Sequence, residues 1–178
     1  MNDYEMEEVL YTREQIAARV KELGAQITKD FEGQEILLVG ILKGSIPFMA
    51  DLMREINLDV EIDTMVVSSY GGGTISSGIV NIKKDLNTNI EGKNVILVED
   101  IIDTGFTLSH LVVMLKERKP ACLKVCSMLD KPSRRKVEFE GDYIGFTVED
   151  KFIVGYGLDY DQKLRQLPEI RTIKLLTN

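Results

Sequence analysis

The sequence predicts an α/β fold in which a mostly parallel, twisted sheet is flanked by helices. Short apolar runs typical of buried strands alternate with longer stretches whose apolar residues recur at helical spacing. Several apolar runs pass directly into unusual polar segments, at 42–45, 99–107, 130–133 and 157–165. Ligands of open α/β sheets bind beyond the carboxyl ends of the strands. We therefore expect these segments to meet at one edge of a single domain spanning residues 1–178.

The first half of the chain predicts two helices and two strands. Thr12 and Gln15 match a capping box, and apolar residues follow at helical spacing, which predicts a helix from residue 13 to about 30. Ser45 as a cap and an early proline indicate the start of the second helix. The apolar patterns predict a strand over 35–44, a helix over 45–57 and a strand over 59–70. A polar, glycine-rich loop follows over 71–78.

The second half continues the alternation of strands and helices. Apolar runs predict strands over 95–98, 123–129, 142–146 and 152–157. A helix is expected over 104–119, because basic residues and then Pro120 form a stop signal at its end. The pattern assigns no element to residues 1–12, 80–94 or 166–178.

Composition and charge limit the classes of partner. Of 178 residues, 44% are hydrophobic and 29% charged, as in ordinary globular domains, and no apolar run is long enough to cross a membrane. The net charge of −7 argues against binding to nucleic acid or to an anionic membrane, both of which want a basic face. Cys122 and Cys126 are expected to be free thiols. Because the N-terminus has no signal-peptide pattern, we expect a cytoplasmic protein.

The stretch "VILVEDIIDTGFTLS" places two adjacent carboxylates directly after a buried strand. Glu99 and Asp100 repel each other and are costly to desolvate, so they need a cation, a hydroxyl-rich ligand or open water. Backbone N–H groups of residues 103–107 can form an anion-binding nest at the start of the next helix, to which Thr104 and Thr107 add hydroxyl groups. A ligand with a phosphate close to a vicinal diol suits both the acidic pair and the anion-binding nest, which favours a site for ribose 5-phosphate.

Other phosphate and nucleotide motifs do not fit the sequence. Gly73 and Gly78 have the spacing of a P-loop, but Ile79 and Val80 stand where Lys and Ser/Thr are needed. The two aspartates in "DIIDT" are one residue too far apart for a DxDxT phosphatase, and a Rossmann GxGxxG is missing.

The strand-to-helix stretch resembles the phosphoribosyl pyrophosphate (PRPP) motif of the type I phosphoribosyltransferases. "ILKGS", "SSYGGGTISSG", "DKPSRR" and "DKFIVGYGLDYDQKLRQLPEI" resemble, in order and approximate spacing, the hypoxanthine-guanine branch of that family. The resemblance covers nearly the whole chain after the first helix. It implies the type I phosphoribosyltransferase fold, with a small hood formed by the terminal segments, and a homodimer or homotetramer. It also implies Mg²⁺-dependent transfer of ribose 5-phosphate from PRPP to a 6-oxopurine in purine salvage.

The resemblance implies a role for each matching residue of the PRPP site. Glu99 and Asp100 would hold the ribose hydroxyls and, together with Asp159, bind magnesium. The ribose phosphate would be bound by Asp103, Thr104, Gly105, Phe106 and Thr107. Phe106 stands where some relatives carry lysine, so only its backbone would contribute. Pyrophosphate would be contacted by Lys43, Gly44, Ser69, Tyr70 and Arg165, with Ser69 and Tyr70 in a mobile lid at about 68–80. The family holds the peptide before Lys43 in the cis form.

The purine site is implied in the same way. Phe152 would stack on the purine, and Lys131 would donate to its 6-oxo group, which favours a carbonyl over the amino group of adenine. The backbone carbonyls of Ile153 and Asp159 would accept from the N1–H group and, in guanine, from the 2-amino group. Asp103 would take the N7 proton as a general base.

Simpler explanations exist for several of these residues taken singly. Phe152 could belong to the core, Asp159 could cap a turn, and Arg165 could form a surface ion pair with Asp161. A nucleotide-sensing RNA-binding regulator on the same fold would share the PRPP motif. The acidic charge balance and the match at Lys131 and Phe152 argue against that regulator.

Overall fold

The structure is a computed structural model that describes residues 3–69 and 80–176. Tyr70 and most of the lid expected at about 68–80 lie outside these residues. Among the described residues, no helix has the length and apolar character needed to span a membrane.

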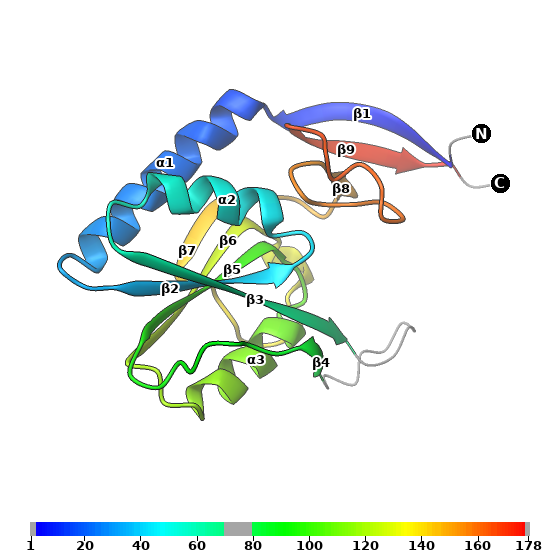
Figure 1. The fold of residues 1–178 in the computed structure, drawn as a ribbon. Helices are drawn as coiled ribbons and strands as arrows, with labels where there is room; N and C mark the ends of the chain where they lie inside the picture. Colours follow the sequence, from blue (N-terminus) through cyan, green and yellow to red (C-terminus); the bar gives the residue numbers. More distant parts are fainter. Residues whose placement is uncertain (1–2, 70–79, 177–178) are drawn as a thin grey trace.

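A twisted six-stranded sheet forms the centre of the molecule (Figure 1). Its strand order is β4-β3-β2-β5-β6-β7, and every neighbouring pair is parallel except β3 with β4. The strands are β2 (Ile36–Leu42), β3 (Val60–Ser69), β4 (Val80–Lys84), β5 (Asn94–Ile102), β6 (Cys122–Asp130) and β7 (Tyr143–Thr147). The prediction of a mostly parallel sheet is confirmed.

Helices cover both faces of this sheet (Figure 1). α1 (Arg13–Asp30) and α2 (Ile46–Glu55) lie on one face and α3 (Phe106–Lys116) on the other, with a 3₁₀ turn at Pro132–Arg134. Because side chains alternate along a strand, Leu38 packs into the core beneath α1 and α2, whereas Leu37 packs into the core beneath α3. Both leucines are fully buried, as expected for a strand that is covered on both faces.

The predicted helix ends need three corrections. Thr12 and Gln15 form the expected capping box, but the Ser45 hydroxyl donates to the carbonyl oxygen of Ile41 at 2.7 Å and does not cap α2. α3 begins at Phe106 rather than at residue 104, because Gly105 precedes it with a φ of 84°. It ends at Lys116 rather than at 119, where Lys119 has a φ of 56°, a value that a right-handed helix does not accommodate.

The chain termini form a small hood over the carboxyl edge of the central sheet (Figure 1). Its antiparallel sheet has the order β1-β9-β8, from β1 (Tyr4–Tyr11), β9 (Ile170–Leu175) and β8 (Ile153–Val154). The Leu176 N–H donates to the carbonyl oxygen of Asp3 at 2.9 Å, so the two ends of the described chain are joined. The expected hood is confirmed, although no element was predicted over β1, β9 or β4. β8 is shorter than the predicted 152–157 because residues 155–157 all have positive φ.

Candidate active site

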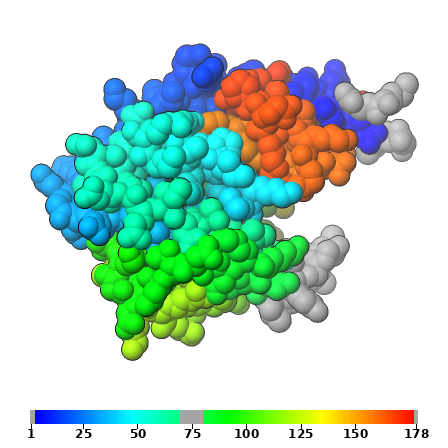
Figure 2. Space-filling view, viewed as in Figure 1, coloured from blue at the N-terminus to red at the C-terminus, as the bar shows by residue number. Residues whose placement is uncertain are grey.

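A cavity of about 270 Å³ opens at the carboxyl ends of β2 and β5. Residues 41–44 line one side and residues 99–105 line the other, together with Thr107 and Leu108 at the start of α3. In Figure 2 the molecule is hollowed between the orange surface of the hood and the green surface of the sheet layer below it. The segments at 130–133 and 157–165 reach the same edge, since Lys131 N–H donates to the Ile102 carbonyl and Gly157 packs on Gly44. The structure therefore brings the predicted segments together.

The acidic pair lies at the end of β5, on the wall of this cavity. Both side chains are half-buried, and the Glu99 carboxylate accepts the Asp100 N–H at 3.1 Å. Burial raises the pKa of Glu99 well above its ordinary value, and the neighbouring charge of Asp100 raises it further. Burial also raises the pKa of Asp100, against the attraction of Arg165. Charged carboxylates in such surroundings need a cation or hydroxyl donors.

The turn after the acidic pair leads into the N-terminus of α3. Gly105 takes a left-handed conformation, and a Cβ at this position would lie 2.9 Å from Cδ of Arg135. The first N–H groups of a helix have no acceptor within the helix, so that of Thr107 can donate to an anion, and that of Phe106 makes only a long contact of 3.5 Å with Oγ1 of Thr104. Thr104 and Thr107 line the same cavity as Glu99 and Asp100. This geometry suits a phosphate placed next to the carboxylates.

The turn at Lys43 and Gly44 forms the opposite wall. The Leu42–Lys43 peptide bond is cis, as the family resemblance implied. A Cβ on Gly44 would lie only 1.6 Å from Oδ2 of Asp100, so only glycine permits this approach. Lys43 Nζ lies 3.3 Å from the side-chain oxygen of Gln162 in the hood. Of the other expected pyrophosphate contacts, Ser69 is the last residue of β3, whereas Tyr70 lies outside the described residues.

The loop that follows the hood strand β8 contributes a charged pair. Arg165 Nη2 lies 2.7 Å from Oδ1 of Asp159, and its other terminal nitrogen donates to the Gly157 carbonyl. The alternative pairing of Arg165 with Asp161 is wrong, because Asp161 lies near Lys163 instead. Asp159 also accepts the Gln162 N–H at 2.8 Å, so the turn-capping role is present as well. The expected pyrophosphate contact and the expected metal ligand are therefore neighbours.

The side of the site expected to hold the purine combines a buried lysine with an exposed aromatic ring. Lys131 is buried, and its Nζ donates to the Lys151 carbonyl at 2.6 Å. Burial lowers the pKa of Lys131. Phe152 is 43% exposed, so its interpretation as a core residue is wrong. Its ring packs edge-on against Tyr160 with centroids 5.6 Å apart, and the next residue, Ile153, begins β8. A partly exposed ring that follows directly on Lys151, whose carbonyl accepts from Lys131, suits a flat, carbonyl-bearing ligand.

Two arginines that the sequence interpretation passed over organise this site. Arg134 Nε donates to Oδ1 of Asp103 at 2.6 Å, and its Nη1 lies 3.4 Å from both carboxylate oxygens of Asp150. Arg135 donates to the backbone carbonyl of Asp103 and to the Asp130 carboxylate, and its Nε reaches the Phe139 carbonyl at 2.8 Å. The quoted motif "DKPSRR" contains both arginines and Asp130, but Asp103 and Asp150 lie outside it, so the motif does not reveal those contacts.

The expected magnesium ligands do not form one cluster. Within residues 3–69 and 80–176, no three acidic, histidine or cysteine side chains are placed to hold a metal ion together. Mg²⁺ in proteins is commonly held by one or two carboxylates, with the rest of its shell supplied by substrate oxygens and water. The Glu99–Asp100 pair and Asp159 are oxygen donors of that kind in two separate places.

Comparison with known proteins agrees with the fold and the site. Residues 7–161 match the phosphoribosyl transferase domain family. The chain therefore belongs to the phosphoribosyltransferase family, whose members are pentosyltransferases. Within that family it is similar, over nearly its whole length, to proteins of the hypoxanthine-guanine branch.

Individual relatives show how far this similarity extends. The hypoxanthine-guanine phosphoribosyltransferase of Streptococcus thermophilus is 51% identical over 174 residues, which cover 98% of this chain and 97% of the relative. The protein of the same name from Bacillus subtilis is 48% identical over the same shares. A crystal structure of a hypoxanthine phosphoribosyltransferase from Staphylococcus aureus superimposes with a TM-score of 0.93 at 50% identity, covering 95% of this chain and 92% of that one.

Proposed function

We propose that this enzyme transfers ribose 5-phosphate from PRPP to N9 of hypoxanthine or guanine, giving IMP or GMP and pyrophosphate in purine salvage. One observation carries the proposal: the N-terminus of α3, the Glu99–Asp100 pair and the Lys43–Gly44 turn line one cavity. A 5-phosphate, a ribose diol and a 1-pyrophosphate occur along PRPP in the same order. Each group of PRPP thus has a matching partner in the cavity.

The neighbouring segments supply a place for the base. The ring of Phe152 is free on the surface to stack on a purine, as aromatic side chains do with nucleobases. Lys131 has three donors, of which one reaches the Lys151 carbonyl, so others are available to a 6-oxo group. An amino group at the same place would present hydrogens to the lysine. The pair therefore selects 6-oxopurines over adenine.

The donor set of the site suits magnesium. Glu99 and Asp100 would hold one ion on the ribose side, and Asp159 would hold another near the pyrophosphate. A bound Mg²⁺ supplies positive charge that stabilises the departing pyrophosphate. The raised pKa of both members of the acidic pair supports this, because a nearby cation relieves the cost of keeping them charged.

The reaction breaks the bond from the anomeric carbon to a pyrophosphate oxygen and forms a bond from that carbon to N9. The proton on N7 of the base then has to leave, and Asp103 is the group that we assign to accept it. Arg134 contacts Oδ1 of Asp103, so we assign Oδ2 to the proton. Asp103→Asn is expected to lower kcat about 100-fold, and the variant should still bind PRPP. An unchanged kcat across the pH range would remove this role.

An assay with the unmodified enzyme tests the function as a whole. Purified protein, PRPP and Mg²⁺ are mixed with hypoxanthine, guanine or xanthine, and nucleotide formation is followed by absorbance, with adenine as the control base. We expect product with hypoxanthine and guanine and none with adenine. No nucleotide with any of the three 6-oxopurines would rule the proposal out.

We also propose that the enzyme is a cytoplasmic homodimer or homotetramer. Ile46 on α2 and Ile62 on β3 are each more than half exposed. Exposed apolar side chains of this size suit contacts with a second copy of the chain. Cys122 and Cys126 are free thiols, which suits a reducing compartment. Light scattering coupled to size exclusion should give at least twice the 20.1 kDa chain mass; a monomer at micromolar concentration would contradict this.

A further inference from the structure

The hood turns toward the Lys43–Gly44 turn, here called the pyrophosphate loop, through three consecutive residues with positive φ. Gly155, Tyr156 and Gly157 have φ values of 93°, 47° and 101°. Glycine adopts such angles freely, but for a bulky aromatic residue the left-handed region is unfavourable. A residue stays in that region only where the surrounding contacts impose it. The contacts of Tyr156 therefore indicate what this turn is built to hold.

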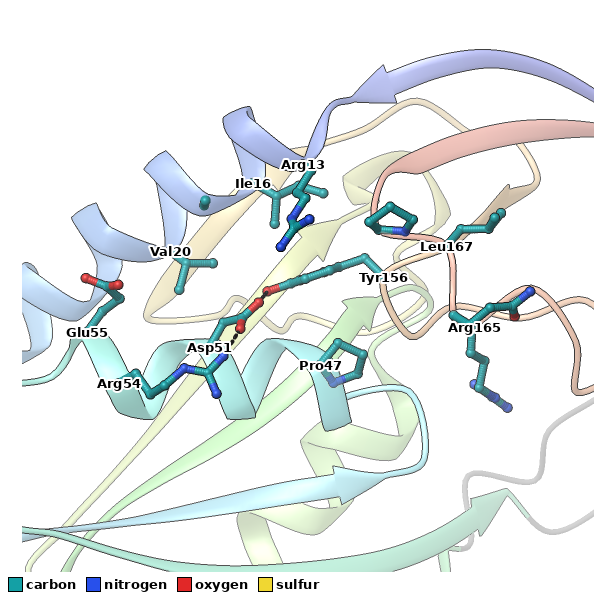
Figure 3. A pocket seen from close by; sticks show the side chains of 13 residues that line it. Arg13, Ile16, Val20, Pro47, Asp51, Arg54, Glu55, Tyr156, Arg165 and Leu167 are labelled. Atoms are coloured by element: carbon teal, nitrogen blue, oxygen red, sulfur yellow. Dashed lines mark hydrogen bonds and ion pairs between the residues drawn. The ribbon is translucent and has the colours of Figure 1, made fainter.

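Tyr156 is anchored to α2 from the hood (Figure 3). Its side chain crosses from the hood turn to the helix, where the hydroxyl donates to Oδ2 of Asp51 at 2.7 Å. Arg54 pairs with the other oxygen of Asp51, so both carboxylate oxygens are engaged. The Tyr156 ring is 7% exposed, and its N–H donates to the Leu167 carbonyl at 2.8 Å. Burial and then the hydrogen bond to the carboxylate raise the pKa of Tyr156, so its hydroxyl remains a donor.

A cavity of about 540 Å³ lies beside this hydrogen bond, between α1, α2 and residues 165–168. Figure 3 shows the Tyr156 ring crossing it between Arg13 and Pro47. The Tyr156 ring lies in the same core cluster as Phe48 and Leu52 of α2, and its hydroxyl adds a hydrogen bond to that helix. Removal of that single oxygen would therefore loosen the turn without removing a large packing contact.

The anchored turn touches the pyrophosphate loop directly. A Cβ on Gly157 would lie 1.9 Å from the carbonyl oxygen of Gly44, so the two backbones are in contact with no side chain between them. α2 begins immediately after this loop and carries Asp51 on its second turn. On the hood side, Asp159 and Arg165 follow Gly157 within eight residues. The hydrogen bond thus spans the joint between the two groups of residues assigned to pyrophosphate.

We propose that Tyr156 and Asp51 are positioning residues for the pyrophosphate half of the active site. Their hydrogen bond fixes the loop of Asp159 and Arg165 against the loop of Lys43 and Gly44. Neither side chain touches a reacting atom. The inference rests on the proposed function, because it assigns the pair to one substrate of that reaction and leaves the purine side unaffected.

Tyr156→Phe removes only the hydroxyl and tests the inference. Loss of one hydrogen bond corresponds to about a fivefold change in an equilibrium constant. We expect the KM for PRPP, and the Kd for magnesium pyrophosphate measured by calorimetry without any base, to rise about fivefold, with the KM for hypoxanthine unchanged. Asp51→Ala should have the same effect, and the double variant should be no worse than either single variant. Asp51→Asn keeps an acceptor oxygen and should behave like the unmodified enzyme.

A second tyrosine–aspartate pair offers a matched control. Tyr143 is equally buried, and its hydroxyl donates to Oδ2 of Asp30 at 2.9 Å, on α1 at the opposite edge of the sheet. Tyr143→Phe should lower the melting temperature about as much as Tyr156→Phe and leave both KM values unchanged. Equal KM values for PRPP in the two variants would overturn the inference, as would Asp51→Asn behaving like Asp51→Ala. Failure of the unmodified enzyme to use any 6-oxopurine would overturn the proposed function instead, and the calorimetric comparison would still decide the role of Tyr156.

Discussion

Asp63 on β3 and the Glu99–Asp100 pair on β5 are carboxylates withdrawn from water, yet their surroundings differ completely. Asp63 is buried and accepts the backbone N–H groups of Thr64, Asn87 and Thr88 at 2.7–2.9 Å, with Lys84 nearby. Among residues 3–69 and 80–176, the N–H groups that the acidic pair accepts come from its own adjoining residues, at Asp100 and Ile101. A carboxylate whose donors come from distant parts of its own chain holds the fold together. A carboxylate without such donors can instead accept hydrogen bonds from a ligand.

The pKa directions express the same contrast. Burial raises the pKa of Asp63, but the hydrogen bonds from Thr88, Thr64, Asn87 and Lys84 outweigh it and lower the pKa to about 2. Burial without such donors raises the pKa of Glu99 and Asp100. The folded protein therefore favours the charged form of Asp63 and disfavours the charged form of the pair. The pair lowers the stability of the ligand-free protein at neutral pH.

Asp100→Asn should have the largest effect on activity and the opposite effect on stability. Loss of an electrostatic partner of the transition state typically costs 10²–10³-fold, so we expect kcat/KM to fall on the order of 1000-fold. The melting temperature should rise, because the substitution removes a charge that the folded state disfavours. Steady-state kinetics and a thermal melt without ligand check both parts. A fall in both quantities would show that Asp100 is structural, like Asp63.

Gly44→Ala should have the second-largest effect on activity, because its new Cβ would lie 1.6 Å from Oδ2 of Asp100 and must displace that side chain. A misplacement of about 1 Å in an active site can cost about 100-fold in rate, which is the fall we expect. Gly33→Ala is the control, since Gly33 also has a positive φ, of 74°, but nothing lies within 4 Å of its added Cβ. The control should lose some stability and keep its activity. Equal activity in the two variants would contradict the assigned closeness of Gly44 to the reacting groups.

Asp63→Asn should mainly reduce stability. The amide cannot accept all the N–H groups that the carboxylate accepts, and hydrogen bonds to a charged group contribute more than neutral ones. We expect the free energy of unfolding to fall by roughly 1–2 kcal/mol, and kcat/KM to stay within about twofold of the unmodified enzyme. Urea unfolding at pH 7 measures the first quantity. A large loss of activity in a folded variant would place Asp63 in the active site and end the contrast.

The smallest expected effect is the pH dependence of the stability difference between the unmodified protein and Asp63→Asn. The folded-state pKa of Asp63, about 2, lies below its ordinary value of 3.8, so its contribution to stability is complete above about pH 4. This contribution is lost as the pH falls from about 4 through 2. The stability difference between the unmodified protein and Asp63→Asn should therefore shrink over that interval. A difference that stays constant between pH 4 and pH 2 would assign the stabilisation to shape rather than charge.

The sequence was sufficient to identify the acidic pair as candidate ligand-binding residues, but it was not sufficient to predict the hydrogen bonds of Asp63. Glu99 and Asp100 follow a buried run directly, so their exceptional position is visible in adjacent letters. Asp63 alternates with apolar residues as any strand residue does, and its donors at residues 87 and 88 lie in a loop more than twenty positions later. Contacts at that sequence distance are set by the tertiary fold, and no local pattern specifies them.

The hood shows the same limit at the level of secondary structure. β1, "YEMEEVLY", contains three glutamates, and residues of this type are rare in strands, so no strand was predicted there. It forms because β9 lies beside it and supplies hydrogen-bond partners from the other end of the chain. Similarly, the motif "DKFIVGYGLDYDQKLRQLPEI" indicated the position of the site residues but not the positive φ values that turn them toward Gly44.

The pairing of β1 with β9 also sets the order in which the enzyme can mature during its synthesis. All strands of the central sheet have been made by residue 147, so that layer can assemble while translation continues. β1, made first, must wait for residues 170–175 before it gains its neighbour. β8, which leads into the loop of Asp159 and Arg165, also pairs with β9, so this loop gains that support only after residues 170–175 have been made. A ribosome-bound chain that stops short of β9 would hold a finished sheet without a working catalyst.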